Sequence, residues 1–406
     1  MLDHLNILLA NACIDKERSE IAMKIPWAKP FINEEVVTQV LETTRSGWLS
    51  MGKQVELLEN TLSQYIGRKN AVVVSNGTIA LDISLDLLDI GSSDEVIVPS
   101  ITYVATVTAV IRRGAQIIFV DVDPFTYNLN PIDLARKVSS RTKCIILIDY
   151  GGNPANYKAI SEIAEGMNIS VLHDGAHSLS GRYDGKALCS QGIISTTSLH
   201  AAKLLTTIEG GVIFTDLDTF TNQAKALRNQ GEVSGEKFVH SSLGYNARLT
   251  DLQAAIALAQ FKSWNEIIKK RLEIANFYTS SLINKPNVIL SKTECSCRTK
   301  ILGGECCRSG WFLFPILIND RDRVAFELGE AGIETRICFP KPLYKQPFYE
   351  KYKKPGDGSD SCPVAEWFAN HVLNLPMFHE ITQDELNYIM DVLIKTVSNE
   401  AFYYQL

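Results

Sequence analysis

Short apolar runs rich in β-branched residues recur between residues 71 and 214, and helix-like segments fill most of the gaps between them. The runs predict strands at 71–74, 95–98, 116–120, 143–148, 169–173 and 211–214. The segments 78–88, 103–113 and 157–166 have the character of helices. This alternation predicts a largely parallel sheet that is covered by helices on both faces. Because ligands of such sheets gather beyond the carboxyl ends of the strands, the residues that follow each run are the candidates for chemistry.

The character of the chain changes after residue 282. A helical pattern over 251–282 is followed by a Cys- and Gly-rich stretch, the strand-like sequence WFLFPILI and a Pro-rich segment. We therefore predict a large domain over 23–264 and a smaller domain over 265–406. Residues 1–22 precede Met23 and are interpreted as an N-terminal extension, either a short helix or a stretch upstream of the true start.

The composition excludes several classes of protein. Of 406 residues, 46% are apolar and 21% are charged, as in an ordinary globular enzyme, and the formal net charge is -6. Because the chain has no long basic run and no apolar stretch of about 20 residues, we expect neither a nucleic-acid partner nor a membrane span. Nine scattered cysteines indicate free thiols and a cytoplasmic location.

Four of the cysteines lie close together in the sequence, at Cys295, Cys297, Cys306 and Cys307. Four thiolates can hold a zinc ion, but the CxC and CC spacings differ from the paired CxxC knuckles of structural zinc sites. We therefore expect a loop with reduced cysteines and no metal.

Three polar features follow predicted strands in a fixed order. The sequence SNGT at 75–78 opens a helix, whose first N–H groups attract a phosphate. Asp174 ends a later strand, and Lys203 follows within the apolar sequence LHAAKLL, where burial would lower the pKa of its amine. Taken singly, Asn76, Thr78 and Asp174 are explained as well by helix N-caps, and Lys203 by a solvated side chain.

Together these features meet the requirements of pyridoxal 5'-phosphate (PLP). A lysine holds its aldehyde as a Schiff base, a carboxylate keeps its pyridine nitrogen protonated, and a helix N-terminus holds its phosphate. No other common cofactor requires this set, so we predict a PLP enzyme. The sequence has no GxGxxG or GxxxxGK[ST] loop, which leaves a nicotinamide dehydrogenase as the weakest alternative.

From about Ile25 almost to the C-terminus, the sequence resembles the DegT/DnrJ family of PLP-dependent sugar aminotransferases. The resemblance is found in the stretches SGWLSMGKQVELLE, VSNGTIAL, DEVIVPSITYVATVTAV, HDGAHSLSG, SLHAAKLLTTIEGG, LRNQG and GYNARLTDLQAAIALAQ. It implies an α/β protein with the aspartate-aminotransferase-like type I fold: a large domain with a mostly parallel seven-stranded sheet, and a smaller C-terminal α+β domain. It also implies a homodimer with shared active sites.

The resemblance implies roles for residues of the cofactor site. Lys203 would bind the cofactor covalently and move protons between cofactor and substrate, while Asp174 would pair with the pyridinium nitrogen. The positions of Gly77, Thr78 and Ser198 match residues that hold the phosphate.

Further residues would complete the site. Asn246 would reach the phosphate from the partner subunit, and His177 would contact the cofactor near its phenolic oxygen. Tyr103 would lie against the cofactor ring, with ordinary helix packing as the alternative. His200 and Glu209 are interpreted either as substrate contacts or as structural residues.

The implied reaction moves an amino group from L-glutamate to a keto sugar carried by a nucleoside diphosphate, at C4 of a 4-keto-6-deoxy sugar. Two alternatives stay open: a non-catalytic relative that binds nucleotide sugar or PLP, and a PLP-dependent sugar dehydratase. Lys203 disfavours the dehydratase branch, whose members have histidine at that position. Departures from the family pattern, which could reshape the substrate pocket, are Leu199, His173, Gly175 and Ile208.

Overall fold

Seven strands form the central sheet of the computed structural model, which describes residues 24–292, 309–359, 362–397 and 402–403. The sheet order is β1-β9-β8-β5-β4-β2-β3. Only β9 runs antiparallel to its neighbours in this sheet. The strands are β1 (Asn70–Val74), β2 (Glu95–Pro99), β3 (Gln116–Val120), β4 (Thr142–Ile148), β5 (Ser170–Asp174), β8 (Ile194–Ser198) and β9 (Gly211–Thr215). The predicted strands therefore agree with the structure to within one residue at each end.

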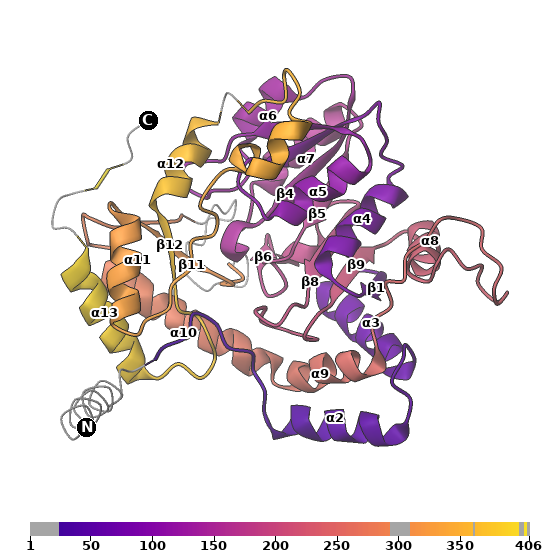
Figure 1. The fold of residues 1–406 in the computed structure, drawn as a ribbon, viewed down its shortest axis with the longest axis horizontal. Helices are drawn as coiled ribbons and strands as arrows, with labels where there is room; N and C mark the ends of the chain where they lie inside the picture. Colours follow the sequence, from indigo (N-terminus) through magenta and orange to yellow (C-terminus); the bar gives the residue numbers. More distant parts are fainter. Residues whose placement is uncertain (1–23, 293–308, 360–361, 398–401, 404–406) are drawn as a thin grey trace, which may run out of the picture.

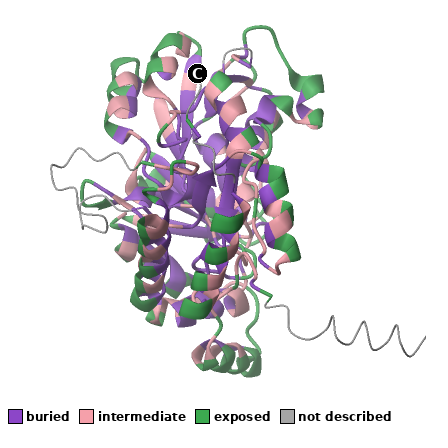
Figure 2. Cartoon of the chain, turned by 90° about the vertical axis from the view of Figure 1, so that its left-hand side faces the viewer, coloured by how far each residue is buried: buried purple, intermediate pink, exposed green. Residues whose placement is uncertain are grey.

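Helices cover both faces of this sheet (Figure 1). On β4, Cys144 and Ile146 pack in one core with α4 (Gly77–Leu87) and α5 (Val104–Arg112), whereas Ile145 and Leu147 pack in another with α6 (Pro131–Lys137) and α7 (Tyr157–Gly166). Buried residues accordingly fill the centre of the molecule in Figure 2. Burial on both faces explains why the strands read as continuous apolar runs.

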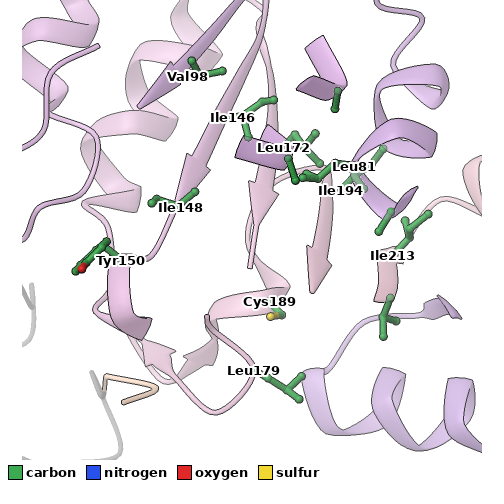
Figure 3. Packing of buried hydrophobic residues seen from close by; sticks show 14 of the residues in the cluster. Leu81, Val98, Ile146, Ile148, Tyr150, Leu172, Leu179, Cys189, Ile194 and Ile213 are labelled. Carbon is green, nitrogen blue, oxygen red and sulfur yellow. The ribbon is translucent and has the colours of Figure 1, made fainter. Parts of the chain in front are cut away.

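Neighbouring strands align their apolar side chains in register. Ile146 of β4 lies opposite Leu172 of β5, which lies opposite Ile194 of β8 (Figure 3). All three strands run parallel, so their carboxyl ends meet at one edge of the sheet. The candidate site lies at this edge of the sheet.

The helical pattern over 251–282 forms two helices, α9 (Asp251–Lys262) and α10 (Trp264–Leu282), with a break at Ser263. Phe261 and Trp264 stack across the break, with ring centroids 5.9 Å apart. Tyr65 contacts both rings edge-on. Tyr65 belongs to α3 (Lys53–Ile66), which packs with α9, as does α2 (Glu34–Ser46). The α8 helix (Asp218–Arg228) packs with β1, the edge strand of the sheet, and with α4.

A second hydrophobic core lies in the C-terminal part of the chain, on the left in Figure 1. An antiparallel sheet of β10, β11 and β12 packs there with three helices. Ile25 joins this core because its backbone bonds to Gly332 and Glu334. The remaining elements are β6 (Arg182–Tyr183), β7 (Lys186–Ala187), β10 (Ile289–Leu290), β11 (Phe314–Leu317), α11 (Arg321–Glu330), α12 (Pro363–His371), β12 (Val372–Leu375) and α13 (Gln383–Thr396).

The structure confirms the predicted fold class, an α/β protein whose mostly parallel sheet has seven strands. The division at residues 264 and 265 stays a prediction. The extension 1–22 and the four clustered cysteines lie outside the described residues. Within the described ranges, no helix is long and apolar enough to cross a membrane, and no three His, Cys, Asp or Glu side chains are grouped as metal ligands.

Candidate active site

A cavity opens at the carboxyl edge of the central sheet. Its lining includes three residues singled out in the sequence, His177, Ser198 and Lys203, together with Phe312 from the C-terminal part of the chain. Ser198 ends β8, and Asp174 ends the neighbouring strand β5. The structure thus brings His177, Ser198 and Lys203 to one cavity, with Asp174 at the end of the neighbouring strand.

Lys203 lies in the connection between β8 and β9, where its N–H donates to the carbonyl of His200 at 2.8 Å. Its Nζ lies 3.9 Å from the centroid of the Phe312 ring. Burial lowers the pKa of Lys203 from 10.5 to about 8, and the negative charge of Asp174 limits this shift. About a tenth of this amine is therefore neutral, and nucleophilic, at pH 7, far more than for a lysine of ordinary pKa.

We expect acetic anhydride to acetylate Lys203 of the cofactor-free protein with a midpoint near pH 8, below the ordinary value of 10.5. The neutral amine is the nucleophile, so labelling rises as the pH increases through the pKa and levels off above it. Peptide mass spectrometry gives the profile, with Lys269, whose side chain is 80% exposed, as the internal reference. A midpoint above pH 10 for Lys203 would contradict this expectation.

Asp174 is buried at the end of β5, and its carboxylate is fixed by hydrogen bonds. Oδ2 accepts from the Thr106 hydroxyl at 2.8 Å, and Oδ1 accepts from the Ala176 N–H at 3.3 Å. The Thr106 hydroxyl in turn lies 2.8 Å from that of Thr102. The carboxylate therefore keeps one orientation beside Lys203.

The turn between β1 and α4 contains a close approach of three backbone segments. Asn76 is the N-cap of α4, as the simpler interpretation predicted, because its Oδ1 accepts from the Ile79 N–H at 2.9 Å. A Cβ on Gly77 would lie 3.0 Å from the Ser198 Cβ, and one on Gly211 would lie 2.4 Å from the Asn76 carbonyl oxygen. The start of α4 thus lies beside the Ser198 side chain, with no other side chain between them. Unpaired N–H groups at a helix N-terminus together with a hydroxyl can bind a phosphate.

His177 lines the cavity, whereas the ring contact of Tyr103 is with Phe339. The half-buried His177 ring has its centroid 4.4 Å from that of Phe312, and its Nδ1 accepts from the Gly151 N–H at 3.3 Å. Burial and the charge of Lys203 hold the pKa of His177 well below 6.5, so the imidazole is neutral. Tyr103 precedes α5, is 60% exposed, and has its ring 6.1 Å from that of Phe339.

The side chains of the other predicted residues, Asn246, His200 and Glu209, are exposed. Asn246 is exposed, and the carbonyl of the next residue, Ala247, accepts from the N–H of Ser75 at 2.8 Å. Its contact with a partner's phosphate stays a prediction. His200 and Glu209 face each other with Nε2 and Oε1 3.6 Å apart. Between Lys203 and Glu209, Ile208 is exposed and has a φ of 70°, a rare conformation for a β-branched residue.

Two departures from the family pattern, His173 and Gly175, are coupled in space. A Cβ on Gly175 would lie 2.9 Å from Cε1 of His173, 2.7 Å from the Thr196 carbonyl oxygen and 2.8 Å from the Cys189 Sγ. The His173 ring is fully buried, and its Nε2 lies 2.8 Å from Oδ2 of Asp149. The glycine therefore leaves room for an imidazole that pairs beneath the catalytic edge.

Asp149 ties this pair to the active-site turn. Its Oδ2 also accepts from the Tyr157 hydroxyl at 2.6 Å and from the Ser178 hydroxyl at 2.8 Å. Ser178 follows His177 directly, so one buried carboxylate connects β4, β5, α7 and the turn after Asp174. Such a fully buried network depends on every partner.

We expect Asp149→Asn to lower the free energy of unfolding by about 3 kcal/mol, since it leaves buried partners without the carboxylate that they share. Urea denaturation of the mutant and wild type measures this change. Asp391→Asn, at an exposed position on α13, is the control and should change it by less than about 0.5 kcal/mol. Equal effects of the two substitutions would show that the network adds no stability.

Sequence reasoning missed Thr106 and Phe312. Thr106 occurs one helical turn after Tyr103 in the quoted stretch DEVIVPSITYVATVTAV, a spacing that places both on one helix face. Phe312 lies within the strand-like WFLFPILI, more than 100 residues from Lys203 in sequence, and gives no local signal of its position.

Comparison with known proteins places this geometry in a family. The model of the DegT/DnrJ/EryC1/StrS aminotransferase family matches residues 30–394. The chain belongs to this DegT/DnrJ/EryC1/StrS family. The predicted resemblance and the predicted aminotransferase class are thereby confirmed.

Individual DegT/DnrJ/EryC1/StrS-type relatives match over almost their whole length. GDP-perosamine synthase of Escherichia coli O157:H7 is 31% identical over 378 residues, which cover 93% of this chain and 99% of that protein. A DegT DnrJ EryC1 StrS aminotransferase from Brucella abortus is 28% identical, with a TM-score of 0.81 over 89% of this chain and 95% of the other. Spr1654 of Streptococcus pneumoniae, solved in its PMP form, is 25% identical, with a TM-score of 0.83 over 92% and 98% of the two chains.

The residues of this family member fit PLP. The turn at Gly77 packs so closely on Ser198 that a side chain there would crowd it, Ser198 and Lys203 line the same cavity, and the Asp174 carboxylate is held by Thr106. An anion cradle, a sheltered lysine and an oriented carboxylate are the three groups that this cofactor needs.

Proposed function

We propose that this protein uses PLP to transfer the amino group of L-glutamate to a nucleoside-diphosphate keto sugar, at C4 of a 4-keto-6-deoxy sugar. The observation that supports it most directly is the Lys203 amine, whose pKa of about 8 makes it nucleophilic in a cavity that it shares with Ser198 and His177. The similarity to GDP-perosamine synthase, a protein named for a GDP-linked sugar product, supports a nucleotide-sugar substrate.

Each residue contributes a separate part of the catalysis. When bound, PLP withdraws electrons from the carbon next to the transferred nitrogen. Lys203 would hold the cofactor aldehyde and then move a proton at its Nζ from one carbon to another, as a general base and acid. Asp174, held by Thr106, would keep the pyridine nitrogen protonated. The N–H groups of Gly77 and Thr78, with the Ser198 hydroxyl, would hold the phosphate.

The neutral His177 would donate or accept a hydrogen bond at the cofactor's phenolic oxygen without adding a charge. Phe312 covers the Lys203 amine with its ring and keeps water from one side of it. Tyr103, largely exposed at the mouth of the site, is available to lie against the cofactor ring. Exclusion of water strengthens each of these electrostatic contacts.

The active unit in this proposal is a homodimer in which Asn246 completes the partner's phosphate site. The loop between α8 and α9, which projects from the body in Figure 1, exposes Phe238 by 86% and Leu243 by 97%. Exposed apolar side chains of this kind favour a protein partner. The same loop contains Asn246.

The test is incubation with PLP, ¹⁵N-labelled L-glutamate and nucleotide-linked 4-keto-6-deoxy sugars, followed by mass spectrometry. A nucleotide sugar that gains a labelled amino group supports the proposal. A sugar that loses water without gaining nitrogen would support the dehydratase alternative, and an unchanged sugar the non-catalytic one.

A further inference from the structure

The segment Arg336–Phe339 follows Ile333 of the second core, and its Cys338 and Phe339 pack against the first core. The hydroxyl of the buried Tyr150, just after β4, donates to the carbonyl of Cys338. The ring of Phe339 lies 6.1 Å from that of Tyr103 and 6.4 Å from that of Tyr150. This segment therefore forms part of the wall that faces Lys203.

Asn374 of β12 fixes the start of this segment. Its N–H donates to the carbonyl of Arg336 at 2.8 Å, and its carbonyl accepts from the Arg336 N–H at 3.2 Å. The buried Asn374 side chain adds a third bond, from Nδ2 to the Arg336 carbonyl at 3.0 Å. Three bonds to one buried residue leave the Arg336 backbone little freedom, so its side chain projects from a rigid base.

Aromatic rings connect the Arg336 side chain to the catalytic lysine. The Arg336 Cζ lies 5.7 Å from the centroid of the Trp27 ring. Trp27 contacts Phe312 edge-on, with ring centroids 6.2 Å apart, and the Lys203 Nζ lies 3.9 Å from the centroid of the same Phe312 ring. The rings of Trp27 and Phe312 thus connect the Arg336 guanidinium to the Lys203 amine through a series of contacts.

The guanidinium of Arg336 has no carboxylate partner in the described part of the chain. None of the ion pairs found there within 4.0 Å includes Arg336. The nearby Glu334 instead accepts from the Trp27 N–H at 3.3 Å. Among the described residues, the Arg336 side chain makes one hydrogen bond, to the carbonyl of Thr335 at a long 3.4 Å.

The positive charges of Arg336 and Lys203 both act on the Cys338 thiol. Both lower the pKa of the Cys338 thiol, although burial raises it to about 11. A guanidinium over a tryptophan keeps its edge free for a planar or tetrahedral oxyanion, which it binds with two parallel hydrogen bonds. A rigid base, an aromatic support and an unpaired charge are the features of a binding residue.

We propose that Arg336 is the oxyanion subsite of this active centre. The inference rests on the proposed function, in which one cavity accepts two anionic substrates in turn: an amino donor with carboxylates and a sugar with a diphosphate. Arg336 binds an oxygen pair of one or both of them and so determines their position relative to Lys203.

The test compares Arg336→Gln and Arg336→Lys with wild type in the two half-reactions, each followed by the cofactor's absorbance in a stopped-flow instrument. Arg323→Gln, on the exposed face of α11, is the matched control. Isothermal titration calorimetry with dTDP, UDP and GDP measures nucleotide binding independently of turnover. Circular dichroism and the unchanged absorbance of the bound cofactor show that each variant is folded.

We expect Arg336→Gln to lower kcat/KM of at least one half-reaction by about 10- to 100-fold, the effect of losing a charged hydrogen bond, with partial recovery in Arg336→Lys. A loss confined to the glutamate half-reaction assigns the donor carboxylate. A loss in the sugar half-reaction with weaker nucleotide binding assigns the diphosphate. If Arg336→Gln keeps kcat/KM of both half-reactions and its affinities for the nucleotides within about twofold of wild type, the proposal is overturned. If wild type shows no half-reaction, the proposed function fails, and calorimetry alone then decides whether Arg336 binds a diphosphate.

Discussion

Replacing Lys203 with alanine will remove the visible absorbance that PLP gives when it is bound to a lysine, in the region of about 400 nm. It will also lower amino transfer by about 10⁴-fold or more, because the same Nζ both holds the cofactor and moves the proton. The structure supports both roles, since the amine is sheltered by Phe312 and has a pKa of about 8. Spectra with added PLP and transfer of ¹⁵N from L-glutamate measure the two effects.

Lys269→Ala is the control for this substitution, since that side chain is 80% exposed on α10. It should leave both the spectrum and the transfer rate at wild-type values. Added methylamine should restore part of the rate in Lys203→Ala, because a free amine can replace a lost proton carrier. An unchanged absorbance in Lys203→Ala would place the covalent site elsewhere and make the non-catalytic interpretation the leading one.

The sheet and the cofactor edge could be predicted because their signals are local. Six strands were predicted from apolar runs, and the position of Asp174 follows from the rule that the carboxyl ends of parallel strands meet at the same edge. The strand that carries Ser198 was not among these six. Once each strand is placed, the side chain that follows it is placed as well. The turn at Gly77 is a further local signal, because a glycine at a strand-to-helix junction allows a close approach.

The residues that the C-terminal part of the chain brings to the site gave no such local signal in the sequence. Phe312 reaches the cavity from a segment more than 100 residues away from Lys203 in sequence, and Tyr150 fixes the Arg336–Phe339 segment through one hydrogen bond to the backbone carbonyl of Cys338. The break at Ser263 has the same origin, since the rings of Tyr65 and Trp264 meet only in the folded protein. Contacts between residues far apart in the sequence are not encoded in the periodicity of either segment.

His173 illustrates an intermediate case. The sequence shows an unusual histidine before the key acid and an unusual glycine after it, but not that the two are coupled. The structure gives the physical reason: the Asp149 carboxylate lies 2.8 Å from the histidine, and the space beside the ring excludes a side chain at Gly175. A departure from a family pattern can thus be noticed in the sequence, while its cause requires the fold.

Asp174→Asn is expected to lower amino transfer by about 10²- to 10⁴-fold while the cofactor stays bound to Lys203. The amide has the shape of the carboxylate and can still accept from the Thr106 hydroxyl, so the fold is preserved. It cannot carry the negative charge that keeps the pyridine nitrogen protonated, so the cofactor withdraws electrons less strongly. Single-turnover kinetics with L-glutamate measure the loss, and Thr106→Val, which keeps the charge, should lose much less.

A second measurement separates this electrostatic role from a loss of structure. The charge of Asp174 raises the pKa of Lys203 against the larger effect of burial, so its removal should move the acetylation midpoint of the cofactor-free protein below about 8. A disordered site would expose the lysine and move the midpoint upward, toward 10.5. A lower midpoint together with slow amino transfer would therefore identify Asp174 as the charge that controls both the lysine and the cofactor. A midpoint that moves upward would assign the lost activity to disorder.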